Sequence, residues 1–194
     1  PAPYNGAGAD TVSYVLALSE IAYSCASTAI VMSVHNSIIC ESVYRYGTEE
    51  QKQKYLIPMT SAKIIGAFAL TEPHAGSNPL AQTTLAVREG GEYVINGTKR
   101  FITSGKNAGM VIVTAKTDKT KAYKGITAFL VKRDNSGMIV GNIEDKMGLR
   151  ASDTTDLIFE NCRVPVEDRL GEEGDGFTIA MTGLDCGRIG VAAQ

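Results

Sequence analysis

The chain has 194 residues, of which 44% are hydrophobic and 21% are charged, and its formal net charge is −2. This balance is ordinary for a globular protein, and it lacks the excess of positive charge that would attract nucleic acid or an anionic membrane. No apolar run is long enough to cross a bilayer, so no membrane insertion is expected. Two histidines and four cysteines without CxxC spacing predict no metal site.

The first third of the chain carries helical patterns. Asp10 or Thr11 can cap a first helix, because their side-chain oxygens can accept the free N–H groups of its first turn. A second apolar run begins near Ser24 and contains His35, which we expect to be a hydrogen-bonded core or cleft histidine rather than a catalytic one. Thr48 and Gln51 have the spacing of a capping box, which predicts a third helix reaching Met59.

At Ile64 the hydrophobic period changes from helical to alternating. After a first strand at 64–70, six further strands are predicted at 83–88, 93–96, 110–116, 126–132, 138–143 and 157–159. Short strands without intervening helices favour an antiparallel barrel or sandwich. A glycine-rich breaker at 171–176 ends this region, and a helical pattern resumes at Phe177. The predicted fold class is therefore α+β, with helices before and after the β-region.

Two stretches end strands with residues suited to ligand binding. In residues 68–78, Thr71 and Ser77 supply hydroxyl groups, and the small side chains around Gly76 allow backbone N–H groups to approach a phosphate. In residues 99–105, an aromatic residue, Phe101, is followed by Thr103 and a turn. Both stretches could also be ordinary strand-to-turn exits, since such residues are common in turns.

Taken together, the order Ala69-Leu70-Thr71-Glu72, Ala75-Gly76-Ser77 and Phe101-Ile102-Thr103 resembles the flavin-binding signature of acyl-CoA dehydrogenases. The resemblance extends from Gly6 to Gly190 and is nearest to the short-chain, butyryl-CoA branch. One departure is Asn78, where the family usually has Asp. The resemblance implies part of an N-terminal helical domain at 1–63, a middle β-domain at 64–175 and the first helix of a truncated C-terminal helical domain at 176–194. The chain begins at Pro1 rather than Met, and we expect it to be a piece of a longer protein.

The resemblance implies FAD-dependent α,β-dehydrogenation of a short-chain acyl-CoA to the trans-2-enoyl-CoA. It also implies that electrons pass to an electron-transfer flavoprotein and that the full-length protein is a homotetramer. The expected location is the cytoplasm of a bacterium, or the mitochondrial matrix if the source is eukaryotic.

The same resemblance assigns residues to the site. Thr103 would hydrogen-bond near N5 of the flavin, and Phe101 would cover a flavin face where the family often has Trp. The implied substrate contacts are Ser77, Asp185 and Arg188, although the last two could instead form a plain ion pair on a helix. The implied FAD contacts are Phe68, Leu70, Thr71, Gly76, Ser77, Phe101, Ile102 and Thr103.

No catalytic base is found in these residues. Most of the family carries the catalytic Glu in the C-terminal helical domain, and a minority branch carries it directly before the arginine, where this chain has Gly187. Glu72 belongs by resemblance to the flavin loop. We therefore expect the 194 residues alone to be inactive. Two alternatives remain open: an acyl-CoA oxidase or related flavoenzyme on the same scaffold, and a non-catalytic β-domain that binds a partner protein.

Overall fold

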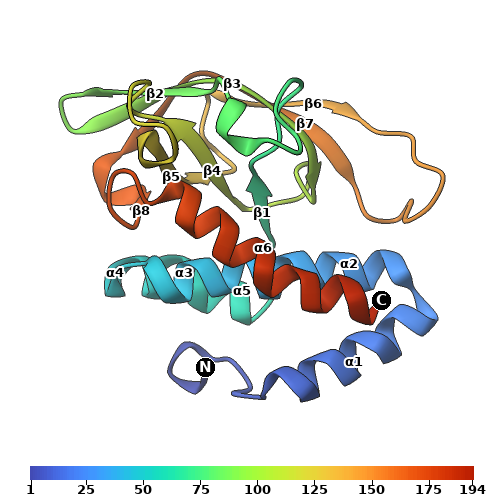
Figure 1. Cartoon of the computed structure of the whole chain (residues 1–194). Helices are drawn as coiled ribbons and strands as arrows, with labels where there is room; N and C mark the ends of the chain where they lie inside the picture. The colour runs from blue at the N-terminus through green and yellow to red at the C-terminus, as the bar shows by residue number, and fades with distance from the viewer.

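A computed structural model describes residues 1–194, and it has two layers (Figure 1). An eight-stranded sheet lies on one side and most of the helices lie on the other, with α6 crossing from the sheet into the helical layer. None of the helices is long and apolar enough to cross a membrane. The helical elements are η1 (Ala2–Tyr4), α1 (Thr11–Ser24), α2 (Ala26–Ser33), η2 (Val34–Cys40), α3 (Glu41–Tyr46), α4 (Glu49–Gln51), η3 (Lys52–Leu56), α5 (Ile57–Thr60), η4 (Pro79–Ala81), η5 (Tyr123–Gly125), η6 (Val166–Asp168) and α6 (Gly176–Ala193).

The predicted helix starts are present. Asp10 accepts a hydrogen bond from the backbone N–H of Ser13 over 2.8 Å and so caps α1. Thr48 and Gln51 form the predicted capping box at the start of α4. The side-chain nitrogen Nε2 of Gln51 also donates to the carbonyl oxygen of Arg169 over 2.8 Å. The residue that completes this cap therefore also ties the helical layer to the edge of the sheet.

The sheet is mostly antiparallel, and its strand order is β6-β7-β3-β2-β4-β5-β8, with β1 paired to β4. The predicted α+β class and the order of helices, sheet and helix are confirmed. Two pairings are parallel: β1 with β4, and β2 with β4 through one residue pair. The strands are β1 (Gly66–Ala69), β2 (Leu85–Glu89), β3 (Glu92–Thr103), β4 (Met110–Lys116), β5 (Ile126–Lys132), β6 (Met138–Ile143), β7 (Thr154–Pro165) and β8 (Arg169–Leu170).

The strands β1 and β2 share one side of β4 but leave part of it uncovered. Ala69 pairs with Val113, and the next pairing on that side joins Leu85 to Lys116. Residues 70–84 leave the sheet between these two points and return to it. The segment 68–78 therefore lies where regular pairing along β4 is interrupted, and other groups must satisfy the backbone there.

The sheet packs on both faces, because side chains alternate along each strand. Met110 and Ile112 of β4 pack with the helices, whereas Val111 and Val113 belong to a second core on the other face. Both faces of β4 are buried, so its sequence is a continuous apolar run.

His35 joins the helical layer to the start of β1. Its Nδ1 accepts a hydrogen bond from the backbone N–H of Gly66 over 3.0 Å, which leaves Nε2–H to donate to the carbonyl oxygen of Met59 at 3.0 Å. Burial lowers the pKa of His35, which favours the neutral ring. A side chain at Gly66 would meet Ile39, because its Cβ would lie 2.5 Å from a methyl carbon. Both ring nitrogens of His35 have partners, as expected for a structural histidine.

Candidate functional site

The two stretches singled out in the sequence lie side by side, although β1 and β3 are not neighbours in the sheet. The backbone N–H of Arg100 donates to the carbonyl oxygen of Thr71 over 2.7 Å. The Lys99 ammonium donates to the carbonyl oxygen of Leu70 over 3.0 Å. Consecutive residues of one stretch thus bind consecutive residues of the other, and the two stretches form one site.

The loop that follows β1 is tightly turned and ends in small exposed residues. Glu72 and Ala75 exchange two backbone hydrogen bonds, of 3.0 and 3.1 Å. Gly76 and Ser77 are exposed beyond this turn, and a Cβ at Gly76 would have no neighbour within 4 Å. The side chain of Asn78 accepts from the backbone N–H of Leu80 over 3.2 Å and caps η4. Asn78 therefore still braces the loop, but without the negative charge of an aspartate.

The end of β3 is irregular where the aromatic residue lies. The register between β3 and β7 shifts between Lys99 and Ile102, and Phe101 has a φ of 59°. This left-handed backbone is uncommon for a bulky residue and costs free energy unless the surroundings hold it. The ring of Phe101 is 55% exposed, with the guanidinium carbon of Arg100 5.0 Å from its centroid. The strand therefore leaves this aromatic side chain more than half exposed.

The hydroxyl groups of these two stretches make no hydrogen bonds within the protein. Thr103 pairs with Thr154 through the backbone, but its hydroxyl has no hydrogen-bond partner in the protein, and the same holds for Thr71 and Ser77. Ile102 differs, because its side chain is buried in the core of the sheet. Any contact of Ile102 with a ligand must use its backbone. Phe68 is half-buried on β1 and packs against the core between sheet and helices.

Sequence reasoning missed one feature of this site: an ion pair beneath the loop. The ammonium of Lys99 lies 2.8 Å from Glu72 Oε1, and both side chains are buried. Burial alone would raise the pKa of Glu72, but the charge of Lys99 and the hydrogen bonds from Lys99, Thr84 and Thr83 hold it at about 2. A lysine on an alternating strand two residues before an aromatic residue gave no signal of burial. The burial of Lys99 is explained only by its ion pair with Glu72.

Asp185 and Arg188 do not join this cluster. They lie on α6 with their charged atoms 3.6 Å apart, and both side chains are almost four-fifths exposed. The residues of the C-terminal half of α6 lie in the helical layer, whereas the loop after β1 lies on the sheet side (Figure 1). The ion pair left open as the alternative for these two residues is present. Gly187, between them, is buried, and a Cβ there would lie 3.1 Å from the side chain of Ile38.

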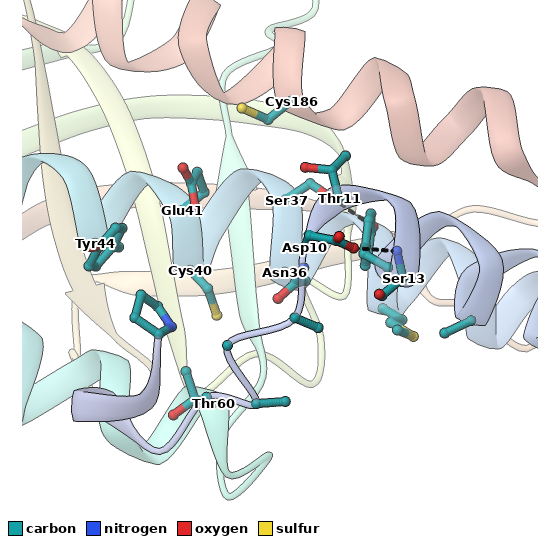
Figure 2. A pocket seen from close by; sticks show the side chains of 18 of the residues that line it. Asp10, Thr11, Ser13, Asn36, Ser37, Cys40, Glu41, Tyr44, Thr60 and Cys186 are labelled. Carbon is teal, nitrogen blue, oxygen red and sulfur yellow. Dashed lines mark hydrogen bonds between the residues drawn. The ribbon is translucent and has the colours of Figure 1, made fainter.

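A cavity of about 510 Å³ lies elsewhere, in the helical layer. Figure 2 shows Asp10, Asn36, Cys40 and Cys186 around it, on the N-terminal loop, η2 and α6. None of the predicted flavin or substrate residues lines this cavity. No cluster of three or more His, Cys, Asp or Glu side chains is arranged to hold a metal ion.

Known proteins match the chain over its whole length. The sequence matches the N-terminal domain of acyl-CoA dehydrogenases over residues 1–63 and the middle domain over residues 67–162. A short-chain specific acyl-CoA dehydrogenase of Clostridium acetobutylicum is 50% identical over 191 residues, which are 98% of this chain and 50% of that protein.

Solved structures agree with this match. Butyryl-CoA dehydrogenase from Megasphaera elsdenii has a TM-score of 0.97 at 45% identity, covering 100% of this chain and 51% of that one. A chain in a structure described as the electron transferring flavoprotein of Acidaminococcus fermentans has a TM-score of 0.98 at 50% identity, with coverage of 100% and 51%.

The chain belongs to the acyl-CoA dehydrogenase family. Within that family, it is similar to the short-chain and butyryl-CoA enzymes, and it spans about half the length of the curated relatives it matches. The family consists of FAD-dependent flavoproteins. The exposed ring of Phe101, the free hydroxyl groups and the open backbone at Gly76 suit an isoalloxazine ring and a phosphate, so these residues fit the cofactor.

Proposed function

We propose that the full-length protein is an FAD-dependent dehydrogenase that converts a short-chain acyl-CoA to the trans-2-enoyl-CoA and passes electrons to an electron-transfer flavoprotein. The observation that carries the proposal is the pairing of the Thr71 loop with the Phe101–Thr103 end of β3, which brings free hydroxyl groups and an exposed aromatic ring together. The similarity to short-chain and butyryl-CoA dehydrogenases supports the reaction and the substrate class.

In this proposal the flavin, when bound, accepts the hydride that leaves the β-carbon of the substrate. Thr103 would donate a hydrogen bond to the flavin, and Phe101 would cover the flavin and help to exclude water. Phe68, Leu70 and Thr71, on β1 and just after it, would line the flavin ring. Ile102 would contact the flavin only through its backbone. Gly76 and Ser77 would approach phosphate, because both residues are exposed just beyond a turn and carry little side-chain bulk.

The acyl-CoA is proposed to contact Ser77, Asp185 and Arg188. Since the last two residues lie in the helical layer and Ser77 does not, a ligand that touches all three must span the two layers. Catalysis also needs a base that removes the α-proton. Gly187 cannot serve, and Glu72 is held ionised in its ion pair with Lys99 and is buried away from solvent. We propose that the base is a Glu outside these 194 residues.

The remaining expectations are parts of the same proposal. They are the division into 1–63, 64–175 and 176–194, the homotetramer, and a location in the bacterial cytoplasm or the mitochondrial matrix. The electron-transfer partner is supported by the similarity to a chain solved under the description of an electron transferring flavoprotein.

The test uses the full-length protein without oxygen. Addition of butyryl-CoA is expected to bleach the visible absorbance of bound flavin, and an electron-transfer flavoprotein is expected to restore it. Pivaloyl-CoA is the matched control, because it has no α-hydrogen to remove and should leave the flavin oxidised. A colourless protein that does not take up FAD would support the partner-binding alternative. Fast reoxidation by oxygen, but not by the flavoprotein, would support an oxidase.

A further inference from the structure

A buried polar cluster fills the gap along β4 where β1 has ended and β2 has not yet begun. The ammonium of Lys99 donates to Glu72 Oε1 at 2.8 Å, to the Leu70 carbonyl oxygen at 3.0 Å and to Gln82 Oε1 at 3.1 Å. The hydroxyl of Thr114, on the uncovered part of β4, donates to Gln82 Oε1 over 3.0 Å. Buried polar side chains thus bind one another beside the part of β4 that neither β1 nor β2 covers.

The carboxylate of Glu72 connects the two ends of the loop. It accepts from the backbone N–H and the hydroxyl of Thr83, and its other oxygen accepts from the backbone N–H of Thr84 over 3.1 Å. Glu72 lies at the start of the 70–84 loop, and Thr83 and Thr84 lie at its end. The carboxylate of Glu72 therefore joins the start of the loop to its end, and the ammonium group of Lys99 attaches the loop to β3.

The point of attachment is next to the proposed flavin contacts. Lys99 directly precedes the register shift that contains Phe101, and Arg100 binds Thr71 through the backbone. From these contacts we infer that Lys99 and Glu72 are positioning residues, which set the distance between the Thr71–Ser77 loop and the Phe101–Thr103 segment. This inference rests on the proposed function, because it assumes that both segments hold one flavin.

If Lys99 and Glu72 only stabilised the fold, a different experimental result would be expected. Replacing both partners of a buried ion pair by well-packed apolar groups is often close to neutral for stability, whereas removing one partner leaves an uncompensated buried charge. If Lys99 and Glu72 serve stability alone, FAD binding should recover in the double variant in step with stability. If they position the loop, the double replacement should restore only part of the stability, because no uncompensated buried charge remains. It should not restore flavin binding, because the Leu70 carbonyl and the N–H groups of Thr83 and Thr84 lose charged partners.

The experiment compares Lys99→Met, Glu72→Gln and the double variant in the full-length protein. Lys54→Met is a control for losing a charged partner away from the loop, since Lys54, on η3, is half-exposed and donates to the carboxylate of Asp168 over 2.8 Å. We expect Lys99→Met to lower the urea midpoint and weaken FAD binding by roughly 10- to 100-fold. The double variant should regain part of the lost midpoint while FAD binding stays at least about 10-fold weaker. The Lys54→Met protein should bind FAD as the wild type does.

Two further readouts separate the possible failures. Hydrogen exchange of the FAD-free protein should speed up at residues 70–84 in the double variant and stay unchanged in Lys54→Met. If the wild type fails to bind FAD, the proposed function is wrong. Faster hydrogen exchange at residues 70–84 in the double variant would in that case still show that the ion pair holds the loop in place. A double variant with wild-type FAD affinity, flavin circular dichroism and exchange would overturn the inference. If Lys99→Met does not fold, Glu72→Gln and the double variant carry the same comparison.

Discussion

The backbone N–H of Arg100, on β3, donates to the carbonyl oxygen of Thr71 over 2.7 Å, in the loop that follows β1, although β1 and β3 do not pair in the sheet. This bond joins two stretches whose residues are about thirty positions apart in the sequence. It sets the exposed ring of Phe101 beside the loop that contains Ser77. The proposed flavin site therefore depends on contacts between β1 and β3 that lie outside the regular strand ladder.

Replacing Thr103 by Val tests the flavin contact. The hydroxyl of Thr103 has no partner in the protein, so the stability of the FAD-free full-length protein should change little. Binding of FAD should weaken by about 1–3 kcal/mol, because a buried polar group of the cofactor loses its partner. Titration of the apoprotein with FAD, together with the flavin reduction potential, measures the effect.

Thr155→Val is the control for this substitution. The hydroxyl of Thr155 is fully buried and donates to the carbonyl oxygen of Asn142 over 2.7 Å, so its loss should lower stability by about 1 kcal/mol. Unchanged FAD affinity and potential in Thr103→Val would show that this hydroxyl does not contact the flavin.

Replacing Phe101 by Gly should separate stability from binding. Glycine adopts the φ of 59° without the steric cost, and the ring it removes is more than half exposed, so unfolding free energy should rise by up to about 1 kcal/mol. Binding of FAD should weaken by about 1 kcal/mol through loss of the aromatic face. Urea unfolding of the apoprotein measures the change in unfolding free energy, and FAD titration measures the change in binding.

Ala62→Gly provides the comparison for Phe101. Ala62 has a φ of 54° in the turn between α5 and β1, so glycine should stabilise the fold there without affecting FAD. Equal FAD affinity in Phe101→Gly and wild type would argue against a flavin face at this position.

Acid should weaken the fold through Glu72. The pKa of its carboxyl is about 2 in the folded chain, against an ordinary value of 4.5, so the unfolded chain binds the proton first as pH falls. The contribution is fully present above pH 4.5 and is lost between pH 4.5 and 2. It amounts to roughly 3 kcal/mol.

The pH dependence is measured by urea unfolding. Glu72→Gln should flatten the fall in stability over this range, whereas Glu160→Gln, an exposed carboxylate on β7, should leave it as in the wild type. An unaltered slope in Glu72→Gln would contradict the assignment of the depressed pKa to this residue.

The 194 residues alone should not reduce flavin with butyryl-CoA. General-base help is typically worth 10²–10⁴-fold, and this chain carries no assigned base. Gly187→Glu should not supply one, because a Cβ at this buried position meets Ile38 at 3.1 Å and an unpaired carboxylate there should cost about 2 kcal/mol or more. Anaerobic bleaching by the 194-residue chain at the rate of the full-length enzyme would place a base within it, and Glu72 would be the first residue to replace.

The sequence by itself determined the elements whose signals are local. The capping box at Thr48 and Gln51 and the change to alternating periodicity at Ile64 each depend on residues a few positions apart, and each appears as predicted. The α+β class followed from their order. The family followed from the stretches at 69–77 and 101–103, because their residue order is distinctive without knowledge of their contacts.

Only the tertiary structure decided how those stretches meet. Periodicity cannot show that β1 runs parallel to β4, because that pairing joins segments separated by the β2–β3 hairpin. Nor can it show that Lys99 is buried, since a lysine on a strand is normally solvated. The hydrogen bonds from Lys99 to Glu72, Leu70 and Gln82 together offset the free-energy cost of removing its charge from water. The site is thus specified by long-range hydrogen bonds and a buried charge pair, whose partners come together only when the chain is folded.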